Sequence, residues 1–254
     1  MVYFFKKLHR LHRTAGSFKN FRKRIRLIFK KILQGACIAV KHPIITIERE
    51  YGSGGSVVGK KVAEKLGIPF YNHEILEMAA ERLNVPVAKL EGAEESSPKS
   101  FLYTLLLNSN PSKAMEDNLP VSDKLYITET QIIKELAEQG SCVIVGRCAN
   151  WILRDNPHKF STFIYAPRAF RLAYAQKTYQ VTEKEISTLL PKIDNRREKF
   201  YNLNTGGNWY DKNNYALCIN TGFMGITGAT HLIYHTVRGI PDPEFRNEEA
   251  EETA

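Results

Sequence analysis

Residues 44–67 read IITIEREYGSGGSVVGKKVAEKLG, and this stretch decides the fold. It opens with a short β-branched apolar run at residues 44–47, which is typical of a strand buried in a parallel sheet. A glycine-rich turn follows at residues 52–55, and then an amphipathic helix that Gly67 is expected to end. The apolar face of this helix consists of Val58, Val62, Ala63 and Leu66. Strand, glycine turn and helix form the layout of a phosphate-binding loop, in which backbone N–H groups and the helix N-terminus attract an anion.

The loop differs from the usual phosphate-binding pattern at one position. Residues 54–61 fit the pattern GxxxxGK, but this register puts the lysine about a turn and a half into the helix, and Lys61 replaces the magnesium-binding hydroxyl. Aligning residues 52–54 with the loop instead leaves Gly55 at the place of the lysine and Ser56 at that of the Ser or Thr. The sequence therefore predicts a phosphate loop without its lysine. The alternative is a glycine-rich turn that binds no ligand.

The charge of the chain is unevenly distributed. The 254 residues carry a net charge of +9, and 43% of them are hydrophobic, which is ordinary for a globular protein. Residues 1–41 hold 12 of the 36 Lys and Arg residues and no Asp or Glu, so 24 basic and 27 acidic residues remain for the rest. The net charge is thus a poor argument for a fold that binds nucleic acid specifically. No CxxC pair occurs among Cys37, Cys142, Cys148 and Cys218, which favours reduced thiols in a cytoplasmic protein.

The basic leader, residues 1–41, has the pattern of an amphipathic helix. Its apolar residues recur at helical spacing between lysines and arginines: Phe18, Phe21, Ile25, Ile28, Phe29 and Ile32. No apolar run is long enough for a membrane span. Peripheral contact with an anionic membrane, contact with a nucleic acid, packing on the body and an extension without a role all stay open. At the other end, residues 241–254 are acidic and are expected to be disordered.

The rest of the chain alternates between strand and helix patterns. Four further apolar runs predict strands at residues 68–71, 141–147, 162–166 and 216–220. Amphipathic patterns predict helices at residues 73–84, capped by Asn72, at residues 122–139 and at residues 225–237, with another that starts at residues 167–168 and a short one within residues 86–121. This alternation predicts an α/β fold with a five-stranded parallel sheet between two layers of helices. Arg147 then lies at the carboxyl edge of the sheet, where open α/β folds bind ligands.

Residues 168–211 combine many cationic and aromatic side chains. This run contains Arg168, Arg171, Lys177, Lys184, Lys192, Arg196, Arg197, Lys199, Tyr201 and Trp209. A solvated helix face is one interpretation. The other is a closing lid whose arginines neutralise the charge of a phosphoryl group in transfer, a demand that is greater where the loop lysine is absent.

Several motifs in this order resemble a known family. They are REYGSGG at residues 49–55, VIVGRCA at 143–149, YAP at 165–167, DNRR at 194–197 with Tyr201, WYD at 209–211, NY at 214–215 and CINT at 218–221. From about residue 43 to residue 237, the chain resembles the cytidylate kinase-like family of nucleoside monophosphate kinases. The resemblance implies a P-loop kinase fold, with a nucleotide-binding insertion at about residues 73–125 and a lid at about residues 168–211, in a domain spanning residues 42–240. It also implies transfer of the γ-phosphoryl group of ATP, with Mg²⁺, to a nucleoside monophosphate such as CMP.

The resemblance also implies roles for individual residues. Residues 52–55 (Gly52, Ser53, Gly54 and Gly55) would hold the donor phosphates through their N–H groups, and Ser56 would lie at the magnesium. Arg147 would bind the phosphate of the acceptor. Arg171, Arg197 and Arg196 would clamp the transferring group, while Asp194 would orient an arginine or the acceptor sugar. The missing lysine leaves open a regulatory protein that binds nucleotides without turnover. Cys148 and Asn150, which differ from the acidic residues usual in the family, leave open a kinase for another small acceptor.

Overall fold

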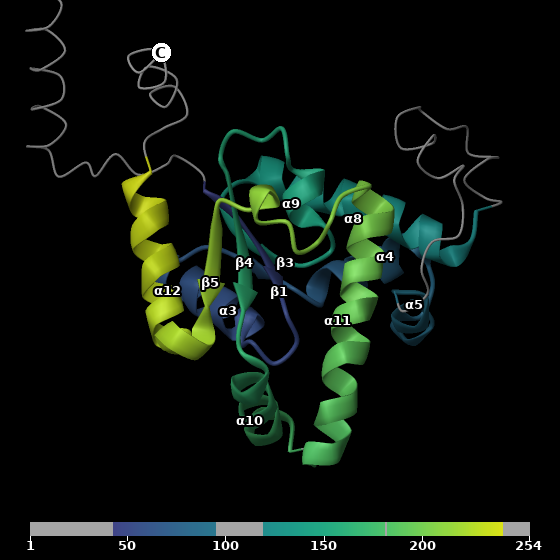
Figure 1. Ribbon diagram of the computed structural model, residues 1–254. Helices are drawn as coiled ribbons and strands as arrows, with labels where there is room; N and C mark the ends of the chain where they lie inside the picture. Colours follow the sequence, from purple (N-terminus) through teal and green to yellow (C-terminus); the bar gives the residue numbers. More distant parts are fainter. Residues whose placement is uncertain (1–42, 95–118, 181, 241–254) are drawn as a thin grey trace, which may run out of the picture. The chain divides into compact units, whose positions relative to one another are not determined.

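The computed structural model describes residues 43–94, 119–180 and 182–240. Within these residues the sheet has five strands, all parallel, in the order β2-β3-β1-β4-β5 (Figure 1). The strands are β1 (Ile44–Arg49), β2 (Phe70–Tyr71), β3 (Cys142–Val145), β4 (Lys159–Tyr165) and β5 (Leu217–Asn220). The predicted five-stranded parallel sheet is therefore confirmed. The predictions for the leader and for the acidic tail lie outside the described residues.

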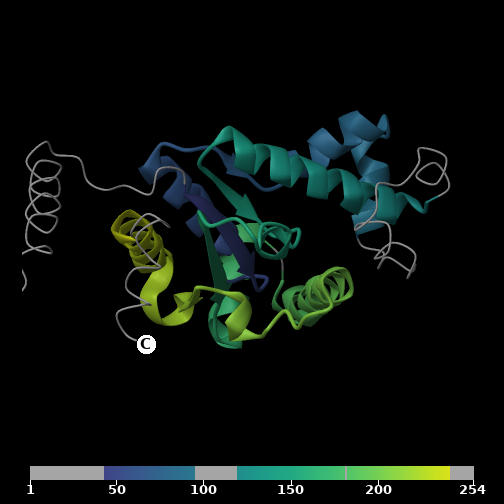
Figure 2. The same ribbon diagram turned by 90° about the horizontal axis from the view of Figure 1, so that it is seen from above.

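Helices cover both faces of the sheet (Figure 2). Helices α3 (Gly55–Leu66) and α12 (Thr221–Gly239) pack on one face, around Ile45, Ile47 and Val143. Helices α4 (Glu74–Leu83), α8 (Val121–Gln139) and α9 (Ala149–Ile152) pack on the other, around Ile44 and Ile144. The remaining helices are α5 (Val87–Glu94), α10 (Arg168–Tyr179), α11 (Glu183–Thr205) and the 3₁₀ turn η1 (Lys212–Asn214). This is the predicted three-layer α/β/α fold.

The helix boundaries follow local sequence signals in most places. Helix α3 ends at Gly67, whose left-handed backbone (φ 65°) accommodates the predicted stop. Helix α11 starts with a capping box between Thr182 and Glu185. The prediction that Asn72 caps α4 is wrong by one residue, because the N-cap is His73 and the Asn72 N–H instead donates to the Glu74 carboxylate. Helix α12 begins four residues before the predicted start and contains a kink at Gly225 (φ 68°).

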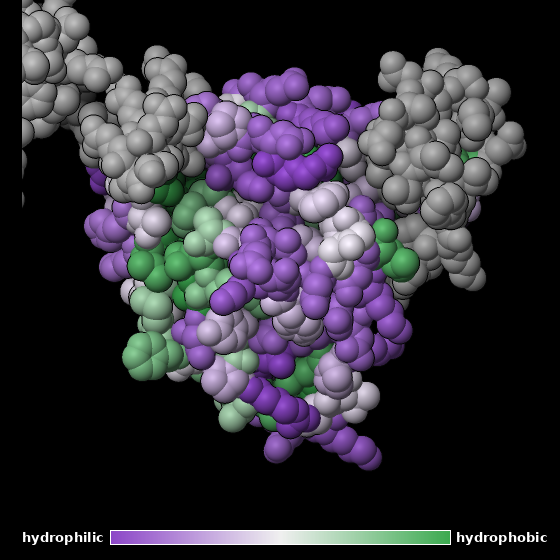
Figure 3. Space-filling view, turned by 45° about the horizontal axis from the view of Figure 1, so that its top comes forward, coloured by the Kyte–Doolittle hydropathy of each residue, from purple (hydrophilic) through white to green (hydrophobic). Residues whose placement is uncertain are grey.

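The surface differs between the two sides of the face shown in Figure 3. Hydrophilic side chains cover most of this face, and hydrophobic ones gather on the side of α12. At the start of α12, Phe223 is 89% exposed. Among the described residues, no helix combines the length and the apolar content that crossing a bilayer requires.

The sheet register brings the ends of β1 and β3 together. Strand β1 is central, and Ile47 lies opposite Val145 of β3 and Thr162 of β4. The turns that follow β1 and β3 therefore emerge side by side at the carboxyl edge. Residues 50–54 and 146–148 form these turns.

Candidate active site

The glycine turn after β1 is tightly packed from outside. Gly52 and Gly54 have φ values of 76° and 78°, a left-handed backbone that side chains strongly disfavour. A Cβ atom on Gly52 would lie 2.8 Å from the backbone oxygen of Arg171. A Cβ on Gly54 would lie 2.8 Å from the Cδ1 atom of Ile226. Backbone conformation therefore favours glycine at both positions, and contact with the backbone of α10 requires it at Gly52.

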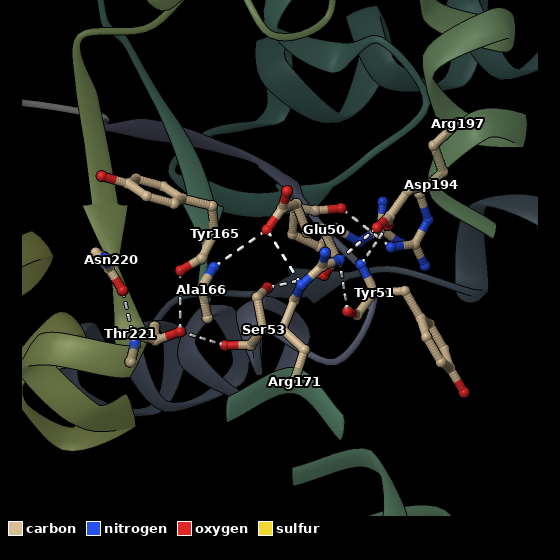
Figure 4. Close-up of polar contacts among 12 residues, drawn as sticks. Glu50, Tyr51, Ser53, Tyr165, Ala166, Arg171, Asp194, Arg197, Asn220 and Thr221 are labelled. Atoms are coloured by element: carbon tan, nitrogen blue, oxygen red, sulfur yellow. Dashed lines mark hydrogen bonds and ion pairs between the residues drawn. The ribbon is translucent and has the colours of Figure 1, made fainter. Parts of the chain in front are cut away.

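Polar contacts hold this turn in place (Figure 4). The Ser53 hydroxyl donates to the Glu50 carbonyl oxygen at 2.8 Å, so the side chain acts inside the turn. From α12, the Thr221 hydroxyl donates to the Ser53 carbonyl oxygen at 2.7 Å. From α11, Asp194 accepts the Tyr51 N–H at 2.7 Å. The turn is thus fixed to two helices that are distant from it in the chain.

The side chain of Arg171 takes part in this network of polar contacts, and Arg171 lines neither the hollow at α3 nor the pocket beside it. Its guanidinium donates to Asp194, forms an ion pair with Glu50 at 3.4 Å and donates to the Tyr51 carbonyl oxygen at 3.3 Å. Burial raises the pKa of Glu50, while the Ala166 N–H and Arg171 act in the opposite direction. Arg171, on α10, and Asp194, on α11, therefore hold the glycine turn between them (Figure 4).

The first turn of α3 faces a small hollow of about 60 Å³. Gly54, Gly55, Ser56 and Val57 line it on one side, and Tyr174 and Tyr179 on the other. The first N–H groups of an α-helix have no acceptor within the helix, so they are available to an anion. The ring of Tyr51 stacks on that of Tyr179, with 5.4 Å between the ring centroids. This hollow has the size and the polarity to take phosphate groups, not a whole nucleotide.

The turn after β3 has an unusual backbone. Gly146, Arg147 and Cys148 are all left-handed, with φ values of 77°, 56° and 54°. A non-glycine residue in this region costs roughly 1–2 kcal/mol, and such strain is concentrated at functional sites. The result is a side chain in a fixed position: Arg147 Nε donates to Glu129 Oε1 at 2.7 Å, and Nη1 donates to the Asn72 carbonyl oxygen. The side chain of Glu129, on α8, is only 1% exposed.

A pocket of about 240 Å³ lies at this edge of the sheet. Its lining is dominated by four arginines and completed by three further residues: Arg49, Arg147, Arg196, Arg197, Asn72, His73 and Phe200. Among the described residues that line it, none is acidic. Arg197 donates to the Arg49 carbonyl oxygen at 3.0 Å and lies over the ring of Tyr51. The lining of the pocket is therefore strongly basic, with one aromatic ring, that of Phe200.

A buried carboxylate lies beneath the arginines. Glu48 is 4% exposed and accepts a hydrogen bond from Trp209 Nε1 at 3.1 Å. Burial raises its pKa, and the charges of Arg49 and Arg197 act against that rise. Burial also lowers the pKa of Arg197, while Asp194 and Glu48 oppose that change. Glu48 and Arg197 thus lie close enough for each to influence the pKa of the other.

The predicted site residues divide into three groups. Arg147, Arg196 and Arg197 share the arginine pocket. Gly52, Gly54, Gly55 and Ser56 line the neighbouring hollow. Ser53, Arg171 and Asp194 lie behind the glycine turn and hold it. The roles assigned to all of them stay predictions.

Sequence reasoning missed six residues in and around the arginine pocket. Four of them line it: Arg49, Asn72, His73 and Phe200. Glu129 holds Arg147, and Glu48 lies beneath the arginines. Arg49 had a signal, since it is the last residue of a buried strand that ends at the ligand edge. Glu129 had one as well, because it is a charged residue on the buried face of α8. Charged residues are almost never fully buried unless they are paired.

The fold of this chain is similar to that of several solved structures. An uncharacterized protein from Eubacterium ventriosum ATCC 27560 is 28% identical, with a TM-score of 0.59, and the match covers 78% of this chain and 99% of that chain. Shikimate kinase from Bacteroides thetaiotaomicron is 14% identical, with a TM-score of 0.47 and coverage of 77% and 98%. A gluconokinase from Sinorhizobium meliloti 1021 is 12% identical, with a TM-score of 0.41 and coverage of 76% and 95%. Among curated proteins, none matches the sequence.

The family comparison covers most of the chain. The cytidylate kinase-like family matches residues 44–222, a range that runs from the first residue of β1 to the start of α12. It includes the glycine turn, the strained turn after β3 and all four arginines of the pocket. The chain belongs to the cytidylate kinase-like family.

Proposed function

We propose that this protein transfers the γ-phosphoryl group of ATP, with Mg²⁺, to a nucleoside monophosphate, and that CMP is the first acceptor to test. The observation that carries the proposal is the arginine pocket beside the glycine turn. Four arginines in the lining of one pocket of about 240 Å³ favour an acceptor that carries negative charge of its own. A phosphate-bearing acceptor supplies this charge, and a neutral sugar does not.

The donor side is supported by the glycine turn and α3. Two left-handed glycines shape the turn, and the N-terminus of α3 directs its N–H groups and partial positive charge at the hollow. The triphosphate of ATP fits such a site. The hollow and the pocket share two cationic residues, because Arg49 and Arg197 line both.

The acceptor side combines charge with one aromatic surface. Arg147, held by Glu129, presents a fixed cation to a phosphate. Phe200 offers an apolar face to a base, and Asn72 and His73 offer polar groups. This combination supports a nucleotide. It does not by itself select the base, which is why the assay begins with a full panel.

The reaction needs positioning more than acid–base chemistry. An oxygen of the acceptor phosphate bonds to the γ-phosphorus, the bond from that phosphorus to the β,γ-bridging oxygen breaks, and ADP leaves with the electron pair. The attacking oxygen is already anionic at neutral pH, so no side chain has to remove a proton. The arginines neutralise the charge that spreads over the transferring group. The clasp formed by Arg171 and Asp194 keeps the glycine turn in register with them.

Magnesium requires few protein ligands here. Mg²⁺ in such sites is held by one or two protein oxygens, together with substrate phosphates and waters. The Ser56 hydroxyl, in the first turn of α3, lines the hollow and can serve as that ligand. Within the described residues, no group of three or more His, Cys, Asp or Glu side chains could hold a metal alone. The ion would thus arrive with the nucleotide.

The test is ADP release from ATP and Mg²⁺ with each nucleoside monophosphate in turn, using the full chain. We expect turnover that depends on the monophosphate and on Mg²⁺, with a pyrimidine monophosphate preferred. Shikimate and gluconate serve as acceptors without a phosphate. Turnover with either of them, or binding of ATP without turnover on any monophosphate, would contradict the proposal.

A further inference from the structure

The place of the missing lysine is already filled. A Cβ atom on Gly55 would lie 2.5 Å from Arg49 Cβ and 3.0 Å from Arg49 Cγ. Real Cβ atoms essentially never approach another atom closer than 3.0 Å. A lysine at residue 55 therefore cannot leave the helix unless Arg49 moves. The stem of Arg49 occupies the volume through which the lysine of a usual phosphate loop would extend.

A second glycine accommodates the other end of the same side chain. A Cβ atom on Gly146 would overlap Nη1 of Arg49 and lie 3.1 Å from its Cζ. The guanidinium therefore lies against the backbone of the turn after β3. Gly55 and Gly146 come from different turns, and each leaves space for one part of Arg49.

Arg49 lies where the two parts of the site meet, the hollow at the glycine turn and the arginine pocket. It lines the hollow at the glycine turn and also the arginine pocket. Its own carbonyl oxygen accepts the Arg197 N–H, so the backbone of Arg49 and the side chain of Arg197 are held together. Arg49 and Arg197 are the two cationic residues that both cavities share.

We propose that Arg49 is a catalytic residue that replaces the loop lysine, with its charge delivered from the end of β1 instead of the start of α3. It would contact the terminal phosphates of the donor and follow the γ-phosphoryl group during transfer. A guanidinium can bind two phosphate oxygens at once, which suits this border position. The inference rests on the proposed function.

A structural role is the competing explanation, because Arg49 also interacts with buried Glu48. Two kinds of variant separate the roles. Arg49→Met keeps the stem and removes the charge. Arg49→Gly/Gly55→Lys moves a cation from β1 to α3, and glycine is needed at residue 49 because even its Cβ would collide with a side chain at residue 55. Arg49→Gly and Gly55→Lys alone are the matched single variants.

We expect Arg49→Met and Arg49→Gly to lower kcat by at least about 100-fold, the usual effect of losing one group that stabilises transition-state charge. Gly55→Lys alone should also lose activity, because the two stems collide. The double variant should exceed Arg49→Gly by at least about 10-fold in kcat, which a purely structural role of Arg49 does not predict. Arg154→Ala, at an exposed arginine beside Trp151, is the control and should keep wild-type kinetics.

The outcomes distinguish this inference from the proposed function. Wild-type turnover together with an active Arg49→Met variant overturns the inference and leaves the function standing. If the wild type turns over no monophosphate, the function is overturned, and the same variants are compared by the Kd for Mg·ATP from titration calorimetry. A Kd that rises at least about 10-fold in Arg49→Met and recovers in the double variant supports Arg49 as the donor cation. Equal Kd values in all variants, or no ATP binding by the wild type, overturn it.

Discussion

The two turns that build the site reach the left-handed backbone with different residues. After β1, both left-handed positions are glycines, Gly52 and Gly54. After β3, Gly146 is followed by Arg147 and Cys148, which adopt the same conformation with side chains. The first turn offers backbone N–H groups, and the cation beside it, Arg49, comes from the end of β1. The second has to aim one side chain, Arg147, and accepts backbone strain to do so.

The two turns therefore show two ways in which one edge of a sheet can form an anion site. A turn that binds with its backbone is protected by packing, since a side chain on Gly52 would meet the backbone of α10. A turn that binds with a side chain is protected by a buried partner, since Glu129 holds Arg147. The four predictions below test this contrast.

Arg147→Ala is expected to have the largest effect. It removes the acceptor cation and leaves the Glu129 carboxylate buried without its arginine, which costs roughly 3–5 kcal/mol of folding free energy. We also expect kcat/KM for the monophosphate to fall by more than about 100-fold, or ~3 kcal/mol. Urea denaturation and steady-state kinetics measure the two losses. Arg147→Lys keeps a charge and is the control; an Arg147→Ala protein as stable as this control would refute the buried pairing.

Gly52→Ala is expected to destabilise the protein by about 2–4 kcal/mol, from left-handed strain and overpacking against Arg171 together. Gly67→Ala is the matched control, because Gly67 has a similar φ of 65° and nothing within 4 Å of the added Cβ. It should lose only the strain, about 1–2 kcal/mol. Denaturation and the Kd for Mg·ATP compare them. Similar losses for the two variants would mean that packing around Gly52 is unimportant.

Glu48 links the two turns. It precedes Arg49 in the chain, and it accepts a hydrogen bond from the backbone of Cys148, in the turn after β3. Since burial raises its pKa above 4.5, the folded state binds this proton more tightly than the unfolded state. Its contribution to stability is therefore complete below about pH 4.5 and is lost as pH rises through the raised pKa. Relative to Glu48→Gln, the wild type should lose stability as the pH rises from 4.5 to 7.5, which urea denaturation at a series of pH values measures. A difference that stays flat with pH would contradict the raised pKa.

Gln180→Gly is expected to have the smallest effect. Gln180 ends α10 with a φ of 54°, is exposed and lies in neither turn. Glycine removes roughly 1–2 kcal/mol of left-handed strain and adds about 0.5–1 kcal/mol of unfolded-state entropy. The net gain should be about 0.5 kcal/mol in thermal or urea unfolding. A net loss would show that left-handed side chains in this protein are not strained, which would weaken the interpretation of Arg147.

The fold could be predicted because its signals are local. The β-branched run at residues 44–47 and the Gly67 stop each determine their element by sequence alone. Five strand patterns separated by helices then leave few topologies open. The exact start of α4 could not be predicted, since Asn72 is the residue that favours a cap, whereas the observed N-cap, His73, makes no side-chain cap bond and the Asn72 N–H donates to the Glu74 carboxylate.

The residues alone made the site predictable in the turns that follow buried strands, where Arg147 and the glycines after β1 lie. Arg196 and Arg197, on α11, were expected from the family resemblance. The contacts of Arg171 with Glu50 could not be predicted, because they depend on how α10 lies against the glycine turn. The relation between Arg49 and Gly55 was equally hidden: the two residues are six positions apart, and only the fold puts their Cβ positions at contact distance.

The central place of β1 also constrains how the protein is made. On the ribosome, the apolar segment at residues 44–47 emerges early, but its partners are residues 142–145 and 159–164. Nearly a hundred residues have to be synthesised before the first of these pairs can form, and contacts so distant in sequence form slowly. During that interval, an unpaired strand is exposed to aggregation. We therefore expect nascent chains that stop before residue 142 to depend on chaperones.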